Sequence, residues 1–225
     1  IMQWLADEDD EELRARIDRE VATNIPPYME QGMPTEQITV AEILRDAGYY
    51  TAHIGKWHLG NAYGMDPLSQ GFQDSLSMVG PLYLPEDHPD VVNAKFDTRI
   101  DQMIWGIGQY SATFNEGELF APDKYLTDYY TDEALKVIEN NKNRPFFLYL
   151  SHWAIHNPLQ ALRSDVEQMR HMEGHNLQVY SGMIAALDRS VGKVVQKLKE
   201  LDIHGKTMII FTSDNGGANY IELDD

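Results

Sequence analysis

The sequence contains no cysteine, has half as many basic as acidic residues, and lacks any long apolar run. Without cysteine, a disulfide framework and thiolate chemistry are excluded within these residues. The 18 Lys and Arg against 36 Asp and Glu give a net charge of −18, which disfavours nucleic acid and anionic membrane surfaces as partners. No apolar run approaches the ~20 residues of a membrane span. An anionic substrate would therefore need a local positive pocket in a negative field.

Alternating strands and helices predict a layered α/β fold with a largely parallel sheet. The chain of 225 residues can bury one sizeable core. It starts with Ile and ends with Leu-Asp-Asp, so we expect a piece of a larger domain that is incomplete at both ends. The expected elements are a helix capped by Thr39 and Glu42 and closed by Gly48, a strand at 49–54, helices at 125–140 and 179–201, and buried strands at 146–150 and 208–211.

The acidic run DEDDEE at residues 7–12 opens an expected amphipathic helix. Acidic residues favour a helix N-terminus, and apolar residues recur every four positions after the run. The simplest interpretation is a solvated helix packed by one face, and a lid or oligomer contact is the alternative.

The stretch GYYTAHIGKWHLG, residues 48–60, presents a lysine and a histidine together. Lys56 and His58 are two residues apart, so an extended backbone would place them on one face, with Trp57 anchoring the turn from the other. A fixed cation beside an imidazole suits an anionic substrate that must also exchange a proton. The spacing between Gly48 and Gly55 does not match a phosphate-binding P-loop. A solvated surface loop remains an open alternative.

Two further groups of polar residues follow the predicted buried strands. His156 comes just after the strand at 146–150, and Pro158 holds the loop extended, so its imidazole could donate a proton to a departing oxygen. We interpret His152, in the same loop, as structural. Asp214 and Asn215 offer oxygen ligands of the kind that Ca²⁺ or Mg²⁺ takes, although an ordinary Asp-Asn-Gly turn is an alternative.

Residues 61–121 form an expected long excursion with little periodicity, of a kind that commonly provides substrate specificity. Its aromatic residues could line a sugar or aryl pocket, but each one alone is more often a packing residue. They are Tyr63, Phe72, Tyr83, Trp105 and Tyr110.

Three stretches in order, GYYTAHIGKWHLG, PFFLYLSHWAIHNPLQA and TMIIFTSDNGG, resemble signatures of the type I sulfatases of the alkaline phosphatase superfamily. The helix YSGMIAALDRSVGKVVQKLKEL is also similar to that family, and the spacing looks most like the arylsulfatase B and galactosamine-sulfatase branch. The resemblance implies an alkaline phosphatase/sulfatase-like sheet with helices on both faces. It implies that residues 1–225 are the central part of the catalytic domain, with 1–33 a possible branch-specific helical insertion.

The resemblance also implies roles for five residues. Lys56 would bind a sulfate oxygen, His58 would handle the proton of a hydrated aldehyde, and His156 would assist the leaving oxygen. Asp214 and Asn215 would ligate a divalent metal, Ca²⁺ by resemblance with Mg²⁺ as an alternative. The substrate would be a small-molecule or carbohydrate sulfate ester, and the compartment periplasmic, secreted or lysosomal.

Two features depart from the family pattern. The sequence has no C/S-x-P-S-R stretch, the site of the formylglycine nucleophile, and no basic residue follows Asp214. We therefore expect the nucleophile and the remaining metal ligands outside these residues, and no activity from them alone. A related phosphoester or phosphonate hydrolase and a non-catalytic sulfatase-like binding protein are the alternatives.

Overall fold

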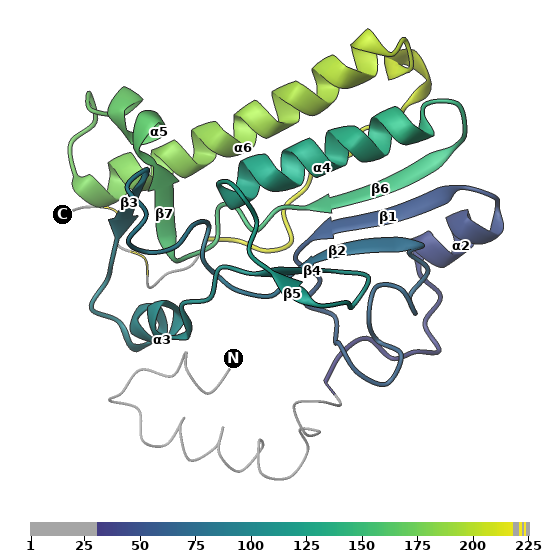
Figure 1. Cartoon of the computed structure of the whole chain (residues 1–225), viewed down its shortest axis with the longest axis horizontal. Coiled ribbons are helices and arrows are strands. Elements are labelled where there is room, and N and C mark those ends of the chain that lie inside the picture. Colours follow the sequence, from purple (N-terminus) through teal and green to yellow (C-terminus); the bar gives the residue numbers. More distant parts are fainter. Residues whose placement is uncertain (1–30, 218–220, 222, 224–225) are drawn as a thin grey trace.

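The computed structural model describes residues 31–217, 221 and 223 (Figure 1). Within them, the main sheet is built from β1 (Tyr50–Gly55), β2 (Asp74–Met78), β4 (Ala112–Phe114), β5 (Leu119–Phe120) and β6 (Phe146–Ser151). The strand order is β5-β4-β2-β1-β6. β1 runs parallel to both β2 and β6, whereas β4 and β5 add antiparallel pairs at one edge. The predicted layered α/β fold with a largely parallel sheet is confirmed.

A second, two-stranded sheet was not predicted from the sequence. It pairs β3 (Val91–Ala94) with β7 (Leu159–Leu162) in antiparallel register. β3 lies in the excursion at 61–121, and β7 follows the loop that contains His156. This pairing ties the excursion to the segment just beyond β6.

The helices are α2 (Val40–Asp46), α3 (Arg99–Ile107), α4 (Leu126–Asn141), α5 (Arg163–Gln168) and α6 (His175–Glu200), followed by the 3₁₀ helix η3 (His204–Lys206). α4 packs on β1 and β6, and α6 lies beside α4 and over β7 (Figure 1). Ile54, Tyr130 and Met183 belong to the core between these layers. On the opposite face of β1 and β6, Phe72 stacks on Phe147 and Tyr149. Within the described residues, the two long helices thus cover one face.

Local sequence signals placed several elements correctly. Thr39 and Glu42 form the predicted capping box at the start of α2. At its end, the Gly48 amide donates to the Arg45 carbonyl and the Tyr49 amide to the Leu44 carbonyl, with Gly48 at φ +90°. This is the Schellman arrangement that a glycine after a helix favours. α4 begins and ends within one residue of the prediction, and α6 begins one turn earlier than expected.

The predicted buried strand at 208–211 is wrong. In the described part of the chain these residues form no strand, and Met208 and Phe211 are 84% and 75% exposed. An apolar run shows that a segment suits burial, but burial also needs a neighbouring strand and a covering layer. In the described residues β6 pairs on one side only, with β1, and residues 208–211 lie unpaired.

The aromatic residues of the excursion mostly pack rather than line a pocket. Phe72, Tyr83 and Trp105 are buried, and Tyr110 is partly buried and donates its hydroxyl to the Lys124 carbonyl. Tyr63 is exposed. The acidic helix predicted from residue 7 lies outside the described residues. Among the residues described, no helix is long and apolar enough to cross a membrane.

Candidate functional site

The site begins where β1 ends against β6. Gly55 has φ +118°, and a Cβ atom there would lie 1.9 Å from the Ser151 carbonyl oxygen, so only glycine fits. The Lys56 amide then donates to that same carbonyl at 2.8 Å. The backbone of Lys56 is therefore held at the carboxyl edge of the sheet, the edge at which open α/β sheets bind ligands.

A buried polar network lies beneath Lys56. His53 is 1% exposed, and its Nδ1 lies 2.9 Å from Ser75 Oγ. Its Nε2 lies 3.2 Å from both the Lys56 carbonyl and Ser151 Oγ, and Ser151 Oγ donates to the Lys56 carbonyl at 2.6 Å. Burial lowers the pKa of His53 to about 4, so the ring is neutral at pH 7. His53 is thus a buried, neutral residue that hydrogen-bonds beneath Lys56.

His58 does not continue the strand. Its φ is +61°, in the left-handed region, so the predicted shared face of an extended strand is wrong in detail. His58 still lies near Lys56, since burial first and then the Lys56 charge lower its pKa, against an opposing effect of Asp214. Trp57 anchors the turn as predicted, because its indole N–H donates to the Met65 carbonyl at 2.8 Å.

The loop after β6 brings an indole and an imidazole together. The rings of Trp153 and His156 stack with centroids 3.8 Å apart, and Lys56 Nζ lies 5.1 Å from the Trp153 ring centroid. His156 Nδ1 lies 2.6 Å from the Asn157 carbonyl, which can only accept, so Nδ1 carries a proton and Nε2 is the atom that can exchange one. Burial lowers the pKa of His156, and the positive charge of Lys56 adds to this effect.

Tyr83 braces this loop from the excursion. Its side chain is fully buried, and its hydroxyl lies 2.8 Å from the His156 carbonyl and 3.1 Å from the Trp153 carbonyl. Gln160 Oε1 accepts from the amides of Tyr83 and Leu84 at 2.8 and 2.9 Å. Sequence reasoning considered Tyr83 as a pocket residue. The structure instead places it behind the loop, as a support.

His152 lies on the helical side of the same loop. Its Nε2 is 2.8 Å from Ser190 Oγ in α6, and burial lowers its pKa to about 4. The structural role that we predicted for His152 stays a prediction.

Asp214 completes the arrangement from the C-terminal side. Its Oδ2 lies 3.7 Å from Lys56 Nζ, and its side chain is 67% exposed. Asn215 follows in the same exposed turn, where its carbonyl accepts from Ser213 Oγ at 2.6 Å. The charges of Lys56 and Asp214 both act on His156. Four of the five predicted site residues thus come together at one edge of the sheet, and their roles stay predictions.

The described residues fit a metal ion only in part. The Asp214 carboxylate and the Asn215 amide are oxygen donors suited to a hard cation. Ca²⁺ takes about six to eight oxygens, however, and within the described residues no three His, Asp or Glu side chains gather as a metal site. These two residues could therefore supply one side of a coordination shell.

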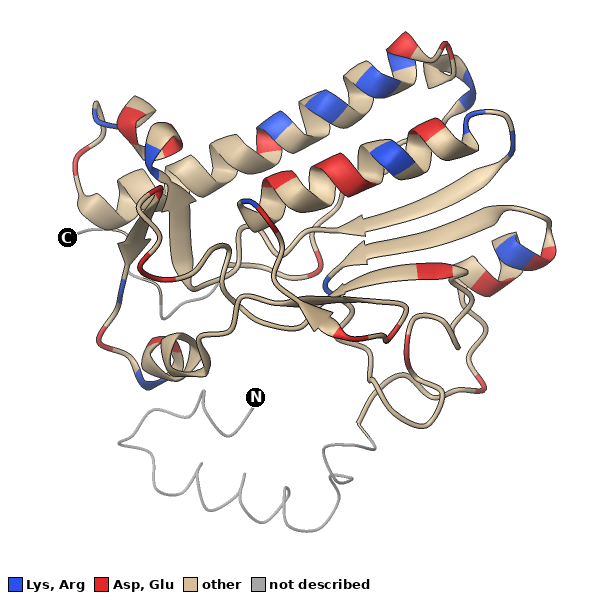
Figure 2. Cartoon of the chain, in the orientation of Figure 1, with Lys and Arg blue, Asp and Glu red and all other residues tan. Residues whose placement is uncertain are grey.

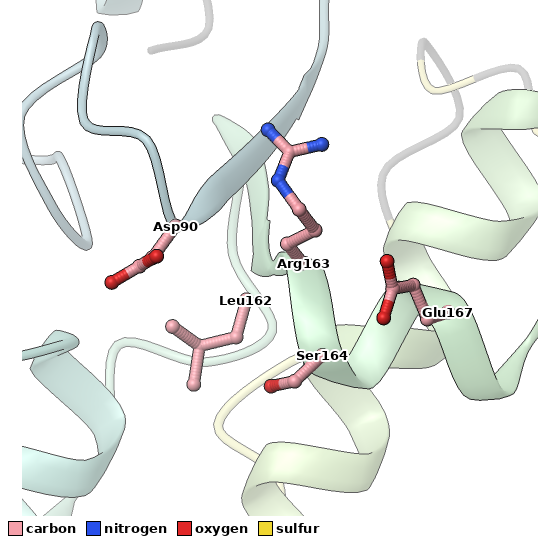
Figure 3. A pocket seen from close by; sticks show the side chains of 5 residues that line it. All are labelled: Asp90, Leu162, Arg163, Ser164 and Glu167. Atoms are coloured by element: carbon pink, nitrogen blue, oxygen red, sulfur yellow. The ribbon is translucent and has the colours of Figure 1, made fainter.

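One hollow of the described structure lies elsewhere. It has a volume of about 310 Å³ and is lined by Asp90, Leu162, Arg163, Ser164 and Glu167 (Figure 3). Arg163 is already engaged there, because its guanidinium donates to the carbonyls of Pro89 and Val91 at 3.0 Å. None of the predicted site residues lines this hollow.

Comparison with known proteins relates this chain to one family. A sequence model of the family described as "Sulfatase" matches residues 15–221. The N-acetylgalactosamine-6-sulfatase of Canis lupus familiaris is 31% identical over 195 residues, 86% of this chain and 35% of the relative. Arylsulfatase J of Mus musculus is 30% identical over 198 residues, 86% of this chain and 31% of the relative. This chain thus spans about a third of the length of these curated relatives.

A solved structure shares the fold. It is described as "Ps i-CgsB in complex with k-i-k-neocarrahexaose", and it superimposes with a TM-score of 0.64 at 29% identity. The match covers 76% of this chain and 38% of that one.

Proposed function

Because this chain belongs to the sulfatase family, we propose that it forms the central part of the catalytic domain of an enzyme that hydrolyses sulfate esters. The observation that carries the proposal is the convergence of Lys56, His58, His156 and Asp214 where β1 and β6 end. These residues come from three separate segments of the chain. A cation, two imidazoles and a carboxylate at one edge suit transfer of an anionic group with proton exchange.

Lys56 binds an oxygen of the sulfuryl group in this proposal. Its side chain is only 17% exposed and lies against Trp153, so its ammonium is partly shielded from water. A charge in such a site stabilises an anion more strongly than one in bulk water. This contact strengthens as charge builds on the sulfuryl oxygens during transfer.

The two histidines move protons. With Nδ1 of His156 bonded to the Asn157 carbonyl, its Nε2 is the atom that donates to the leaving oxygen. A lowered pKa makes the protonated form a stronger acid, although less of it is present at neutral pH. His58 takes or returns the proton at the nucleophile.

Two contributions come from groups that these residues do not contain. A divalent cation, Ca²⁺ or Mg²⁺, would supply positive charge that orients sulfate and nucleophile, and Asp214 and Asn215 would hold it on one side. The nucleophile would be a formylglycine outside residues 1–225, since this sequence has no Cys and no Ser-x-Pro-Ser-Arg. We therefore expect that residues 1–225 alone release no sulfate from an aryl sulfate.

We propose a sulfated carbohydrate as the substrate class, with small aryl sulfates as surrogates. Support comes from the similarity to an N-acetylgalactosamine-6-sulfatase and to a structure whose description includes a neocarrahexaose. In a chain of negative net charge, Lys56 supplies the local positive charge that such an anionic ligand needs.

The test compares Lys56→Ala and His156→Ala in the full-length protein across aryl sulfates of graded leaving-group pKa. Nitrophenolate leaves without needing a proton, so it should largely restore turnover in His156→Ala. It should not restore Lys56→Ala, whose contact is to the transferred group. His152→Gln is the control, and its turnover should follow wild type across the series.

Other outcomes would change the assignment. Release of phosphate or phosphonate but not sulfate by the wild-type protein would favour a related hydrolase of another ester. The same leaving-group dependence in Lys56→Ala and His156→Ala would contradict the division of roles. A leaving-group effect confined to His152→Gln would move the acid to His152.

A further inference from the structure

Trp153 lies against two residues of the proposed mechanism. They are Lys56, which binds the sulfuryl group, and His156, which donates a proton to the leaving oxygen. One part of its ring stacks on His156 with centroids 3.8 Å apart and planes at 22°. Lys56 Nζ lies 5.1 Å from the centroid of the same ring. Lys56 follows β1 and His156 follows β6, which lie side by side in Figure 1. The indole is therefore a single rigid body shared by two segments 100 residues apart in the chain.

Trp153 is itself held at its indole N–H and at its backbone carbonyl. Its indole N–H donates to the Pro81 carbonyl at 2.8 Å, and its own carbonyl accepts from the Tyr83 hydroxyl at 3.1 Å. The His156 amide donates to that same Trp153 carbonyl at 2.9 Å. The side chain is only 8% exposed. Rotation of the indole would break its bond to Pro81, and displacement of the Trp153 carbonyl would break its bonds to Tyr83 and His156.

We propose that Trp153 is a positioning residue, whose indole fixes the Lys56 ammonium and the His156 imidazole relative to each other and thereby to the transferred group. This inference rests on the proposed function. It goes beyond it, because Trp153 exchanges no proton and holds no metal.

Physical chemistry explains why Lys56 needs such a support. A lysine ammonium sits on a flexible four-carbon stem with many rotamers, and substrate binding must order it. The nearby carboxylate of Asp214 is a weak restraint, because it is two-thirds exposed and 3.7 Å away. The face of an indole attracts an ammonium and offers a broad, rigid surface. Ordering Lys56 before the substrate arrives lowers the cost of reaching the reactive geometry.

The competing explanation is that Trp153 is only a core residue. It does belong to the main core cluster together with Ile54 and Tyr83. A core residue acts on stability and should affect all variants alike. A positioning residue acts through Lys56 and His156, so its substitution should matter less once one of them is absent. A double-mutant cycle separates the two explanations.

The cycle uses Trp153→Leu and Lys56→Ala, singly and together, in the full-length protein with nitrophenyl sulfate, for which His156 matters little. Trp153→Leu should lower kcat by about 10–100-fold, because small displacements of a catalytic group cost up to about 100-fold. In the Lys56→Ala background the same substitution should cost only a few-fold. Trp153→Phe keeps an aromatic face and should retain most of kcat.

Trp105→Leu is the matched control. Trp105 has the same 8% exposure, and Lys95 Nζ lies 4.8 Å from its ring centroid. The substitution therefore removes a buried indole and a lysine contact, but not one that involves Lys56 or His156. Its effect on kcat should be the same in the wild-type and Lys56→Ala backgrounds. If Trp153→Leu does not fold, Trp153→Met takes its place, since it keeps length and apolar character without an aromatic face.

Sulfate binding, measured without turnover, tests the positioning role of Trp153 independently of the proposed function. Calorimetry with inorganic sulfate should show weaker binding to Trp153→Leu than to wild type, and unchanged binding to Trp105→Leu. If the wild-type protein hydrolyses no sulfate ester while this difference appears, the proposed function fails and the inference stands. Equal sulfate affinity of Trp153→Leu and wild type, or purely additive effects in the cycle, would overturn the inference.

Discussion

Two regions of this molecule hold buried or half-buried cations in opposite ways. On α6, Arg189 donates to Asp165 of α5 at 2.8 and 2.9 Å and to Asp128 of α4 at 3.4 and 3.5 Å. Lys193 lies 3.6 Å from Asp128 in the same row. Figure 2 shows red residues along α4 and blue residues along the neighbouring α6. Arg189 and Lys193 thus each have a carboxylate partner on a neighbouring helix.

At the carboxyl edge of β1 and β6, the cation is compensated much less. Among the described residues, Lys56 has one carboxylate within 4 Å, that of the exposed Asp214, and its ammonium lies over the uncharged indole of Trp153. A fully paired cation has little capacity left for a further anion, whereas a poorly paired and shielded one attracts it. Arg189 and Lys193 therefore join helices through ion pairs, whereas Lys56 has capacity left for an anionic ligand.

The largest expected effect comes from removing the available cation. In the full-length enzyme, Lys56→Ala should lower kcat/KM for an aryl sulfate by about 10²–10³-fold, the usual cost of one preorganised contact to the reacting group. Lys193→Ala is the matched control and should stay near wild type. A comparable loss in Lys193→Ala would show that general lysine charge, and not the position of Lys56, supports turnover.

The next effect should appear in stability and not in turnover. Arg189→Met removes the partner of Asp165, whose carboxylate is almost fully buried. Breaking a buried pair costs about 3–5 kcal/mol, and the one-third exposure of the Arg189 side chain reduces this to about 2–3 kcal/mol. Denaturant unfolding of the variant measures the loss. Per folded molecule, kcat/KM should match wild type, and a selective loss of kcat would contradict the separation of the two regions.

A smaller, pH-dependent effect should arise at the junction of the two regions, where His152 follows β6 and bonds Ser190 of α6. Its folded pKa of about 4 lies below the ordinary value of 6.5, so below pH 6.5 the unfolded chain takes up a proton that the folded chain refuses. Stability contributed by the neutral ring is complete above pH 6.5 and is lost as pH falls toward 4. Between pH 6.5 and 5.5, this loss should be about 1 kcal/mol.

The measurement is the free energy of unfolding against pH for wild type and His152→Gln, which keeps a group able to bond Ser190 but does not titrate. His53 has a similarly low pKa and is unchanged in both proteins, so it cancels in the difference. Parallel curves for the two proteins would contradict a buried neutral His152.

The smallest effect should follow Lys193→Met. Its side chain is 41% exposed and lies 3.6 and 4.0 Å from Asp128 and Asp132. Exposed pairs of this kind contribute about 0–1 kcal/mol and are screened by salt. The unfolding free energy should therefore change by less than 1 kcal/mol at low salt and by still less at 1 M salt. A loss as large as that of Arg189→Met would show that exposure does not rank these pairs.

Features of the chain decided by near neighbours in sequence were predictable. Thr39 and Glu42 form a capping box at the start of α2, strand-forming residues predict β1, and the spacing of apolar residues predicts α4 and α6. The buried strand predicted from the apolar run at 208–211 is wrong, because burial of a strand depends on a neighbouring strand from elsewhere in the structure. The extended backbone predicted at His58 is wrong for another reason. The neighbouring sequence gives no signal for a left-handed backbone at a residue other than glycine.

The candidate site shows the same limit. Lys56, His58, His156 and Asp214 were named from motifs, but Trp153 was not. The importance of Trp153 depends on contacts with residues 56, 81 and 83, which are close to it only after folding. From the sequence, a tryptophan in such a loop is interpreted as a packing residue, and the proposed positioning role depends on contacts that exist only in the folded structure.

The hydrogen bonds that join Pro81 and Tyr83 to the loop after β6 limit which segments can be exchanged between sulfatases. Replacing the stretch between β2 and β3 with that of a relative would transplant both anchors of the Trp153 loop along with the surface that the exchange is meant to alter. A donor segment without a hydroxyl at position 83 would leave the carbonyls of Trp153 and His156 without this donor. Chimaeras that keep residues 81–84, which Gln160 recognises through two amides, are the ones that should retain an ordered loop.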